Sequence, residues 1–179
     1  LHFLSFSPSK SESNSELRSQ KVLSGISKFF SKQLNNLMNN IKVAVIGANG
    51  VGKTCLLVQL TRNTFNEDYT PTIQDMFEKK ITYQGQEYTL KITDTGGKDE
   101  NANLTDSAIK ESDAFVLVYS IISENSFTKV QDNYQKIKQL NPKNSNRIVI
   151  AGTKSDLESE RMVPEKKAFD YSVQISAGF

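Results

Sequence analysis

The sequence predicts an α/β fold in which a mostly parallel, six-stranded sheet carries helices on both faces. Three runs made mainly of apolar residues, typical of strands buried on both sides, occur at 41–47, 114–120 and 147–153. Stretches with the helical spacing of apolar residues alternate with these runs. Strands that alternate with helices form parallel sheets, because each crossover helix packs on a face of the sheet.

Local patterns predict the remaining strands and helices. The segments 76–83 and 86–94 are joined by a turn at Gly85, which predicts a hairpin and one antiparallel edge strand. A short sixth strand is expected at 171–176. Helices are expected from residue 55 onward, over 123–140 with Ser123 as N-cap, and near 164–170.

The composition excludes several classes of function. Lys and Arg total 22 against 20 acids, so bulk charge favours neither nucleic acid nor membrane, and no nucleic-acid partner is expected. The single cysteine, Cys55, excludes an internal disulfide and suits a reducing compartment. The single histidine, His2, lies outside the α/β region, which excludes a Ser-His-Asp triad and a His-rich zinc site there. A cytoplasmic location is therefore expected.

Residues 1–40 differ in composition from the α/β region at 41–179. Ten of them are serine and five are asparagine, which predicts a poorly ordered arm up to Glu16. Over 17–38 apolar residues recur at three- and four-residue steps, which predicts an amphipathic helix with basic residues on its polar side. Its apolar residues are Leu17, Val22, Leu23, Ile26, Phe29, Phe30, Leu34, Leu37 and Met38, and its basic ones include Arg18, Lys21, Lys28 and Lys32. The helix can bind a membrane surface, making the protein peripheral, dock on a partner, or pack on its own domain.

The segment GANGVGKT, residues 47–54, fits the phosphate-loop pattern G-x-x-x-x-G-K-[ST] between a strand and a helix. Its glycines let backbone N–H groups surround phosphate oxygens at a helix N-terminus, which already favours anions. Lys53 adds a charge at the outer phosphates, and Thr54 offers a hydroxyl to Mg²⁺. The pattern predicts a P-loop NTPase, although a glycine-rich turn without ligand is the alternative. It does not separate ATP from GTP.

The segment TKSD, residues 153–156, follows the strand 147–153 at the carboxyl edge of the expected sheet, where ligands bind. Asp156 can accept hydrogen bonds from the ring N–H and the exocyclic amine of guanine. Adenine would leave this carboxylate unpaired. Lys154 can lay its methylene stem along the base. By itself TKSD is also a common surface turn, so its position relative to the phosphate loop carries the prediction.

These motifs together resemble those of small GTPases of the Ras superfamily, and most closely the Ras subfamily. The stretch FNEDYTPTIQD at 65–75 is similar to the first switch, and DTGG at 94–97 to the start of the second. The resemblance extends over 41–156 without an evident gap. The stretch GKTCLL and the threonine of TKSD are more similar to the Rho branch. NANLTDSAIK, the expected second switch helix, lacks the aromatic and arginine residues common in Ras.

The resemblance implies roles for individual residues. Thr72 would bind Mg²⁺ and the terminal phosphate, Asp94 would hold Mg²⁺ through water, and the Gly97 N–H would contact the same phosphate. Phe65 would lie against guanine and Tyr69 would cover the phosphates. The pair Ser176-Ala177 resembles the last guanine-contacting motif, in which an alanine N–H meets the base. The expected nucleotide-binding residues are Gly47, Asn49, Gly50, Val51, Gly52, Lys53, Thr54, Cys55, Phe65, Tyr69, Thr72, Gly97, Thr153, Lys154, Asp156, Ser176 and Ala177, with Mg²⁺ held by Thr54, Thr72 and Asp94.

Lys98 stands where the family has a glutamine that positions the attacking water. A lysine ammonium only donates hydrogen bonds, so it cannot orient the nucleophile as an amide can. The expected catalytic residues are Lys53, Thr72, Gly97 and Lys98, with slow hydrolysis as the result. Asn49 could also crowd an incoming arginine of a partner. The alternative is that Lys98 points to solvent while a partner supplies the missing amide.

The family has a further C-terminal helix after the position of Phe179. The sequence therefore predicts a Ras-like domain over 41–179 that is truncated at its C-terminus, and no C-a-a-X prenylation box is present. The exposed sheet face that results would be apolar, so the helix at 17–38 is expected to fold back and cover it. The alternative is that the sequence is a fragment at both ends.

The sequence predicts a molecular switch that binds GTP or GDP with Mg²⁺ and hydrolyses GTP. Effectors, exchange factors and GTPase-activating proteins would bind its two switch segments, which are released when the terminal phosphate is lost. One alternative is a module of the same fold that stays GTP-bound with little catalysis. Others are a P-loop ATPase or nucleotide kinase, and a truncated product that binds nothing.

Overall fold

The structure, a computed structural model, describes residues 39–62, 74–83, 85–96 and 102–179. Strands and helices alternate along most of the chain, as the sequence predicts. The strands are β1 Asn40–Gly47, β2 Gln74–Tyr83, β3 Gln86–Thr95, β4 Ala114–Ser120 and β5 Ile148–Thr153. The helices are α2 Lys53–Arg62, α3 Ala102–Glu111, α4 Glu124–Leu140 and α5 Glu165–Gln174, with 3₁₀ helices η2 Pro142–Asn144 and η3 Ser155–Glu160.

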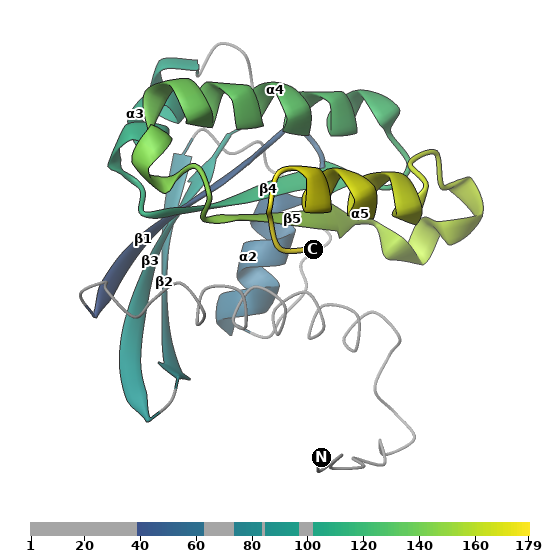
Figure 1. The fold of residues 1–179 in the computed structure, drawn as a ribbon. Coiled ribbons are helices and arrows are strands. Elements are labelled where there is room, and N and C mark those ends of the chain that lie inside the picture. The colour runs from purple at the N-terminus through teal and green to yellow at the C-terminus, as the bar shows by residue number, and fades with distance from the viewer. Residues whose placement is uncertain (1–38, 63–73, 84, 97–101) are drawn as a thin grey trace, which may run out of the picture.

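The five strands form one sheet in the order β2-β3-β1-β4-β5 (Figure 1). β1 lies in the middle and pairs in parallel with β3 on one side and β4 on the other. β4 pairs in parallel with β5, and β2 runs antiparallel to β3 along the predicted hairpin. Gly85 has a φ of 79°, a conformation that glycine adopts readily and that closes this hairpin. The mostly parallel sheet with an antiparallel edge strand is confirmed.

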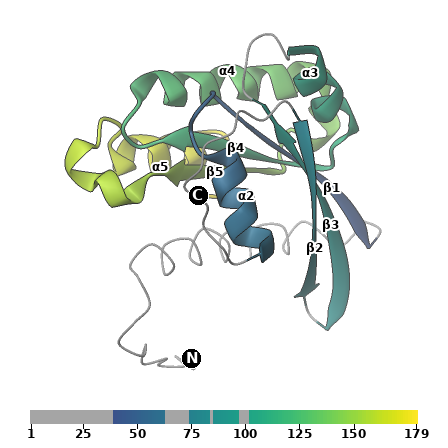
Figure 2. The same cartoon turned by 180° about the vertical axis from the view of Figure 1, so that it is seen from behind.

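Helices cover both faces of the sheet, and the two views in Figures 1 and 2 show α2 on one side and α3, α4 and α5 on the other. Every residue of β4 is buried, as expected for a strand covered on both faces. On the α2 side the sheet presents mainly aliphatic side chains, such as Val43 and Val116. On the other side Tyr119 of β4 packs edge-to-face against Phe127 of α4, with 5.2 Å between ring centroids.

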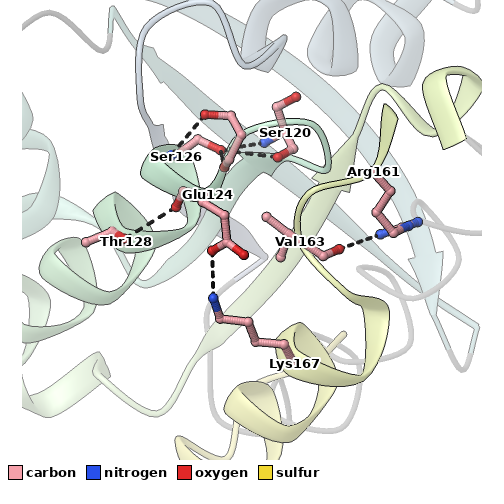
Figure 3. A network of polar contacts seen from close by, with 8 residues as sticks. Ser120, Glu124, Ser126, Thr128, Arg161, Val163 and Lys167 are labelled. Carbon is pink, nitrogen blue, oxygen red and sulfur yellow. Dashed lines mark hydrogen bonds and ion pairs between the residues drawn. The ribbon is translucent and has the colours of Figure 1, made fainter. Parts of the chain in front are cut away.

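The start of α4 is fixed by the predicted N-cap and by a serine network (Figure 3). The Ser126 N–H donates to the Ser123 hydroxyl at 3.3 Å, which satisfies a free N–H of the first turn. The Ser126 hydroxyl lies 2.7 Å from the Ser123 carbonyl oxygen and accepts from the Ser120 N–H at 3.0 Å. In the same view Lys167 of α5 donates to Glu124 of α4 at 2.6 Å, so these helices are joined where α4 begins.

The sixth strand expected at 171–176 is wrong, because α5 extends to Gln174. Ala168 and Ser172 are the buried residues of α5, and they are four residues apart, which is the spacing of one helix face. After α5, Gly178 forms an isolated parallel bridge with Val149 of β5. Within the described part of the chain, no helix is both long and apolar enough to cross a bilayer.

Candidate functional site

The candidate site lies where β1, β3 and β5 end, at the carboxyl edge of their parallel sheet. β1 ends at Gly47, β3 at Thr95 and β5 at Thr153. The phosphate loop, residues 48–52, follows β1 and leads directly into α2 at Lys53. This arrangement places the N-terminus of a ten-residue helix at the edge of the sheet, where its free N–H groups favour an anion.

Glycines shape the loop at the positions where the backbone requires them. Gly50 and Gly52 have φ angles of 71° and 93°, which side chains with a Cβ rarely adopt. At Gly47 a Cβ would clash with the Val118 carbonyl oxygen, so β1 and β4 could not keep their spacing with any larger residue. The motif is therefore required both by the path of the loop and by the packing beneath it.

Lys53 is buried under the loop with only 5% of its surface exposed. Its ammonium donates to the carbonyl oxygens of Gly47 and Ala48, each at 3.0 Å. Burial lowers the pKa of Lys53, and the nearby Asp94 carboxylate opposes that shift. An ammonium has three protons and two are accounted for by these carbonyls, so the side chain retains a donor for an anion above the loop.

Asp94 is fully buried near the end of β3 and contacts the first turn of α2. The Thr54 hydroxyl donates to Asp94 Oδ2 at 2.5 Å, whereas Oδ1 has no hydrogen-bond partner among the residues that the structure describes. Burial raises the pKa of Asp94, and the Thr54 hydrogen bond and the charge of Lys53 oppose this. A buried carboxylate oxygen without a partner is costly, which indicates a position prepared for a ligand.

This pair of oxygens fits Mg²⁺. The ion takes six oxygen ligands, and in nucleotide sites protein side chains supply one or two of them while phosphates and waters supply the rest. The Thr54 hydroxyl and Asp94 Oδ1 are oxygen donors of that kind beside the phosphate loop. Among the described residues there is no group of three or more His, Cys, Asp or Glu side chains that could hold a metal ion.

Thr153 connects the predicted base-binding segment to the phosphate loop. Its hydroxyl lies 2.5 Å from the carbonyl oxygen of Val51 in the loop and 2.9 Å from that of Tyr119 in β4. Thr153 is among the residues expected in the site, but its contact with the loop is not predicted from the sequence. The contact joins residues 102 positions apart, and a threonine after a strand gives no sequence signal for such a partner.

Lys154 and Asp156 follow Thr153 in the turn that begins η3. Lys154 has a φ of 60°, and its carbonyl accepts the Leu157 N–H at 2.9 Å, which closes the turn. Asp156 is exposed, and Lys154 is half-buried. The structure thus brings the TKSD segment and the phosphate loop to the same edge of the sheet. On the loop and α2, Asn49 is exposed and Cys55 is half-buried.

The expected role of Ser176-Ala177 in guanine binding is wrong. Gly178 pairs with Val149 near the start of β5, so this segment lies at the opposite end of that strand from Thr153. Val149 and Thr153 are four residues apart on this strand, a distance of about 13 Å. The Ala177 N–H donates to the Ser172 carbonyl at 2.8 Å and is already used at the end of α5. A two-residue match could not distinguish a base-binding loop from a helix end.

Five of the predicted residues lie outside the described residues. They are Phe65, Tyr69, Thr72, Gly97 and Lys98. The roles of the first switch and of the glutamine replacement therefore remain predictions.

The sequence model of the Ras family matches residues 42–179 of the chain, which include the phosphate loop, Asp94 and the TKSD turn. The chain belongs to the Ras family. It is 33% identical over 138 residues to Ras-like protein 1 of Saccharomyces cerevisiae, covering 77% of this chain and 45% of that protein. This Ras-family chain therefore spans less than half the length of that relative.

Proposed function

We propose that this Ras-family chain is a guanine-nucleotide switch that binds GTP and GDP with Mg²⁺ and hydrolyses GTP slowly. The observation that carries the proposal is the cluster under the phosphate loop. Lys53 is buried there, and beside Thr54 the Oδ1 atom of Asp94 is unpaired within the described part of the chain. This cluster supports binding of a polyphosphate with a divalent cation, because it offers one cation and two oxygen donors at a helix N-terminus.

Each residue of the cluster has a distinct task in this proposal. Lys53 donates to the outer phosphates, and the loop N–H groups surround them. Thr54 and Asp94 hold Mg²⁺, which when bound neutralises charge on the phosphate oxygens. Asp156 accepts hydrogen bonds from guanine, and Lys154 lies along the base. The exposed Asp156 carboxylate at the carboxyl edge supports a guanine rather than an adenine ligand, since adenine has no amine to donate there.

The nucleotide released from the purified, denatured chain tests this proposal. Chromatography should identify GDP or GTP, and competition against a fluorescent GDP analogue should show preference for GTP over ATP. Release of ATP, or equal competition by ATP, would contradict the guanine assignment and favour a P-loop ATPase or nucleotide kinase. A chain that holds no nucleotide and binds none when it is added with Mg²⁺ would contradict the whole proposal.

Lys98 makes hydrolysis slow in this proposal. Partner-stimulated hydrolysis in such GTPases gains about 10⁵-fold, or about 7 kcal/mol, from a water-positioning glutamine and an arginine that act together. Lys98→Gln restores a side chain that both donates to and accepts from water. We expect the single-turnover rate to rise about tenfold or more, equivalent to about 1.4 kcal/mol of barrier.

A matched variant separates the amide from loss of charge at residue 98. Lys98→Met removes the ammonium and adds no acceptor, so its rate should stay near that of the unaltered chain. If the glutamine and methionine variants hydrolyse GTP equally fast, the amide has no role and Lys98 points to solvent. Effectors, exchange factors and activating proteins are proposed to bind the two switch segments. The segment 17–38 is proposed either to contact a membrane surface or partner or to pack on its own domain.

A further inference from the structure

The segment η3, which carries the proposed guanine-binding carboxylate of Asp156, lies outside the core of the protein. All six of its residues are exposed or half-buried, so apolar packing alone does not fix its position. Its backbone is irregular as well, because Leu157 leaves the helical region with a φ of −94° and a ψ of 42°. A short, kinked 3₁₀ segment makes few hydrogen bonds of its own. The contacts that hold Asp156 in place must therefore come from neighbouring residues.

The two ends of this segment are both bound to Ile121, the residue that follows β4. The Ile121 N–H donates to the Thr153 carbonyl at 3.1 Å. The Ile121 carbonyl accepts the N–H groups of Met162 and Val163, each at 2.9 Å. Residues 154–161 therefore form a loop whose two ends are fixed beside the sheet, and Ile121 and Val163 at its base are 2% exposed or less.

Arg161 contributes the side-chain contacts between this loop and its base. Its Nε and Nη2 atoms donate to the two carboxylate oxygens of Glu158 at 2.6 and 2.8 Å, which is a bidentate pair. Its Nη1 atom donates to the Val163 carbonyl at 3.0 Å (Figure 3). A single planar guanidinium thus joins η3 to the buried residue at the end of the loop.

The same guanidinium hydrogen-bonds to Tyr119 of β4, beneath the loop. The Tyr119 side chain is buried, and its hydroxyl lies so close to β5 that a Cβ at Gly152 would touch it. Burial raises the pKa of Tyr119 to about 12, and the charge of Arg161 and its hydrogen bond to the phenol oppose this shift. Gly152 immediately precedes Thr153, so Arg161 is connected to the end of the strand from which TKSD begins.

We propose that Arg161 is a positioning residue for guanine recognition, which fixes η3 against β4 and so keeps the Asp156 carboxylate where the base binds. Asp156 lies two residues before Glu158 in the same short segment, so a shift of η3 moves both carboxylates. Arg161 itself does not touch the nucleotide in this role. The inference rests on the proposed function and adds to it the residue that holds the base-recognition segment in place.

Arginine is better suited to this role than lysine. Its guanidinium carries five N–H donors in a fixed plane, so it can bind both Glu158 oxygens and a carbonyl at the same time. A lysine has the same charge, but its donors surround one nitrogen atom. Arg161→Lys would therefore keep the attraction to Glu158 and lose the geometry that includes Val163 and Tyr119.

Base discrimination by the full chain tests the proposal. Inosine diphosphate lacks the exocyclic amine of GDP, so the ratio of its Kd to the Kd for GDP reports whether Asp156 is in place, independently of the phosphates. Arg161→Met keeps an aliphatic stem and removes every donor. We expect its Kd for GDP to rise about tenfold and the ratio to fall about threefold or more, with Arg161→Lys between this variant and the unaltered chain.

Arg147→Met is the matched control. Arg147 is also a half-buried arginine that donates to a nearby side chain, that of Asn144 at 3.1 Å, but it precedes β5 at the opposite end of that strand from Thr153. The control removes the same atoms and should leave both Kd values unchanged, even if it lowers the melting temperature. A purely stabilising role for Arg161 predicts that the two methionine variants behave alike, which would overturn the proposal.

Hydrogen exchange in the nucleotide-free chain gives a second measurement that does not depend on base binding. The Leu157 and Arg161 amides donate within the loop at 2.9 and 3.2 Å. They should exchange about tenfold faster in Arg161→Met and at an unchanged rate in Arg147→Met. Glu158→Gln, a change at an exposed residue, should shift the exchange and the Kd ratio in the same direction to a smaller extent, and it keeps the test decisive if Arg161→Met does not fold.

The unaltered chain separates a failure of this inference from a failure of the proposed function. A chain that shows no preference for GDP over ATP would contradict the guanine assignment and the positioning role together. A chain that prefers GDP to inosine diphosphate and keeps this preference in Arg161→Met would leave the proposed function standing and overturn the positioning role alone. Unchanged exchange of the Leu157 and Arg161 amides in that variant would also overturn it.

Discussion

Two buried polar clusters lie at opposite edges of the sheet and differ in how completely they are satisfied. The phosphate-loop cluster consists of Lys53, Thr54, Asp94 and Thr153 at the carboxyl edge. The asparagine cluster consists of Ser112, Asn141, Asn144 and Arg147, where α3 and α4 end and β5 is about to begin. Both clusters take polar groups out of water, so each must supply the hydrogen bonds that burial removes.

The asparagine cluster closes on itself. The Asn141 amide donates to the carbonyls of Ile109 and Ser112 at 2.8 and 2.9 Å. The Asn144 amide donates to the Ser112 carbonyl at 3.1 Å, and its oxygen accepts from Arg147. These bonds satisfy the free carbonyls at the end of α3, so the cluster acts as a helix cap.

The phosphate-loop cluster is left open. Asp94 Oδ1 finds no partner in residues 39–62, 74–83, 85–96 and 102–179, and burial disfavours the charged forms of both Asp94 and Lys53. In the asparagine cluster, neutral amide groups make the buried hydrogen bonds instead. The difference teaches that a satisfied polar cluster contributes stability, whereas an unsatisfied charged one keeps binding capacity at some cost in stability.

The largest expected effect is on ligand binding by Lys53→Met, which keeps the aliphatic stem. Loss of the ammonium should weaken nucleotide affinity by about 10³-fold, because truncating a buried charged partner costs about 2–5 kcal/mol. The stability of the nucleotide-free chain should change little, because the variant removes a costly buried charge but also leaves the Gly47 and Ala48 carbonyls without this donor. Since the pKa of Lys53 is lowered, the folded state disfavours its charge at neutral pH, and a neutral side chain removes that cost.

Isothermal titration and urea unfolding measure the two effects separately. Lys42→Met is the control. Lys42 lies on β1, the strand that leads into the phosphate loop, and its exposed side chain forms a surface ion pair with Glu111. It should change neither quantity much. A marked loss of stability in nucleotide-free Lys53→Met would break the comparison, since it would make Lys53 a structural residue like Asn141.

The next largest effect is on stability by Asn141→Ala. Removal of the amide leaves the Ile109 carbonyl without this donor, and a buried unsatisfied group costs about 1–3 kcal/mol. Nucleotide affinity should be unchanged. Gln139→Ala, an exposed amide in the last turn of α4, is the control for helix effects and should leave the urea midpoint nearly constant. Weaker nucleotide binding in Asn141→Ala would show that the two clusters are coupled.

The smallest effect is expected for Thr153→Val, and this variant should change both the stability of the chain and the rate of nucleotide release. The hydroxyl lies between the carbonyls of Val51 and Tyr119, so its loss should cost about 1 kcal/mol of stability and speed nucleotide release about fivefold. Thr128→Val removes a hydroxyl from an exposed residue of α4 and serves as the control. Loss of stability without faster nucleotide release would show that Thr153 contributes only to stability, as the asparagine cluster does.

Much of the fold was predictable because each pattern carried its own physical cause. The apolar runs of β1, β4 and β5, the hairpin turn at Gly85 and the N-cap Ser123 are all confirmed. The strand at 171–176 was not, because a short run with alternating apolar residues fits a strand and a helix end equally well. Burial of Ser172 four residues after Ala168 decides for the helix, and this depends on tertiary packing.

The site was predictable where a motif fixes the backbone and unpredictable where a contact joins distant segments. Lys53, Thr54 and Asp94 come together as the motifs imply. The contact between Thr153 and Val51 and the asparagine cluster were missed, because neither has a local pattern that names its partner. Ser176-Ala177 matched two letters of a motif but lies at the wrong end of β5.

The central position of β1 has a consequence for how the chain folds during synthesis. β1 leaves the ribosome before both of its partners. β3 follows only after α2 and β2 have been made, and β4 only after α3 as well. The hairpin β2-β3 joins neighbours and can form early, whereas β1 must wait to close its long loops. We expect this apolar strand to be the segment of the nascent chain most exposed to chaperones and to aggregation.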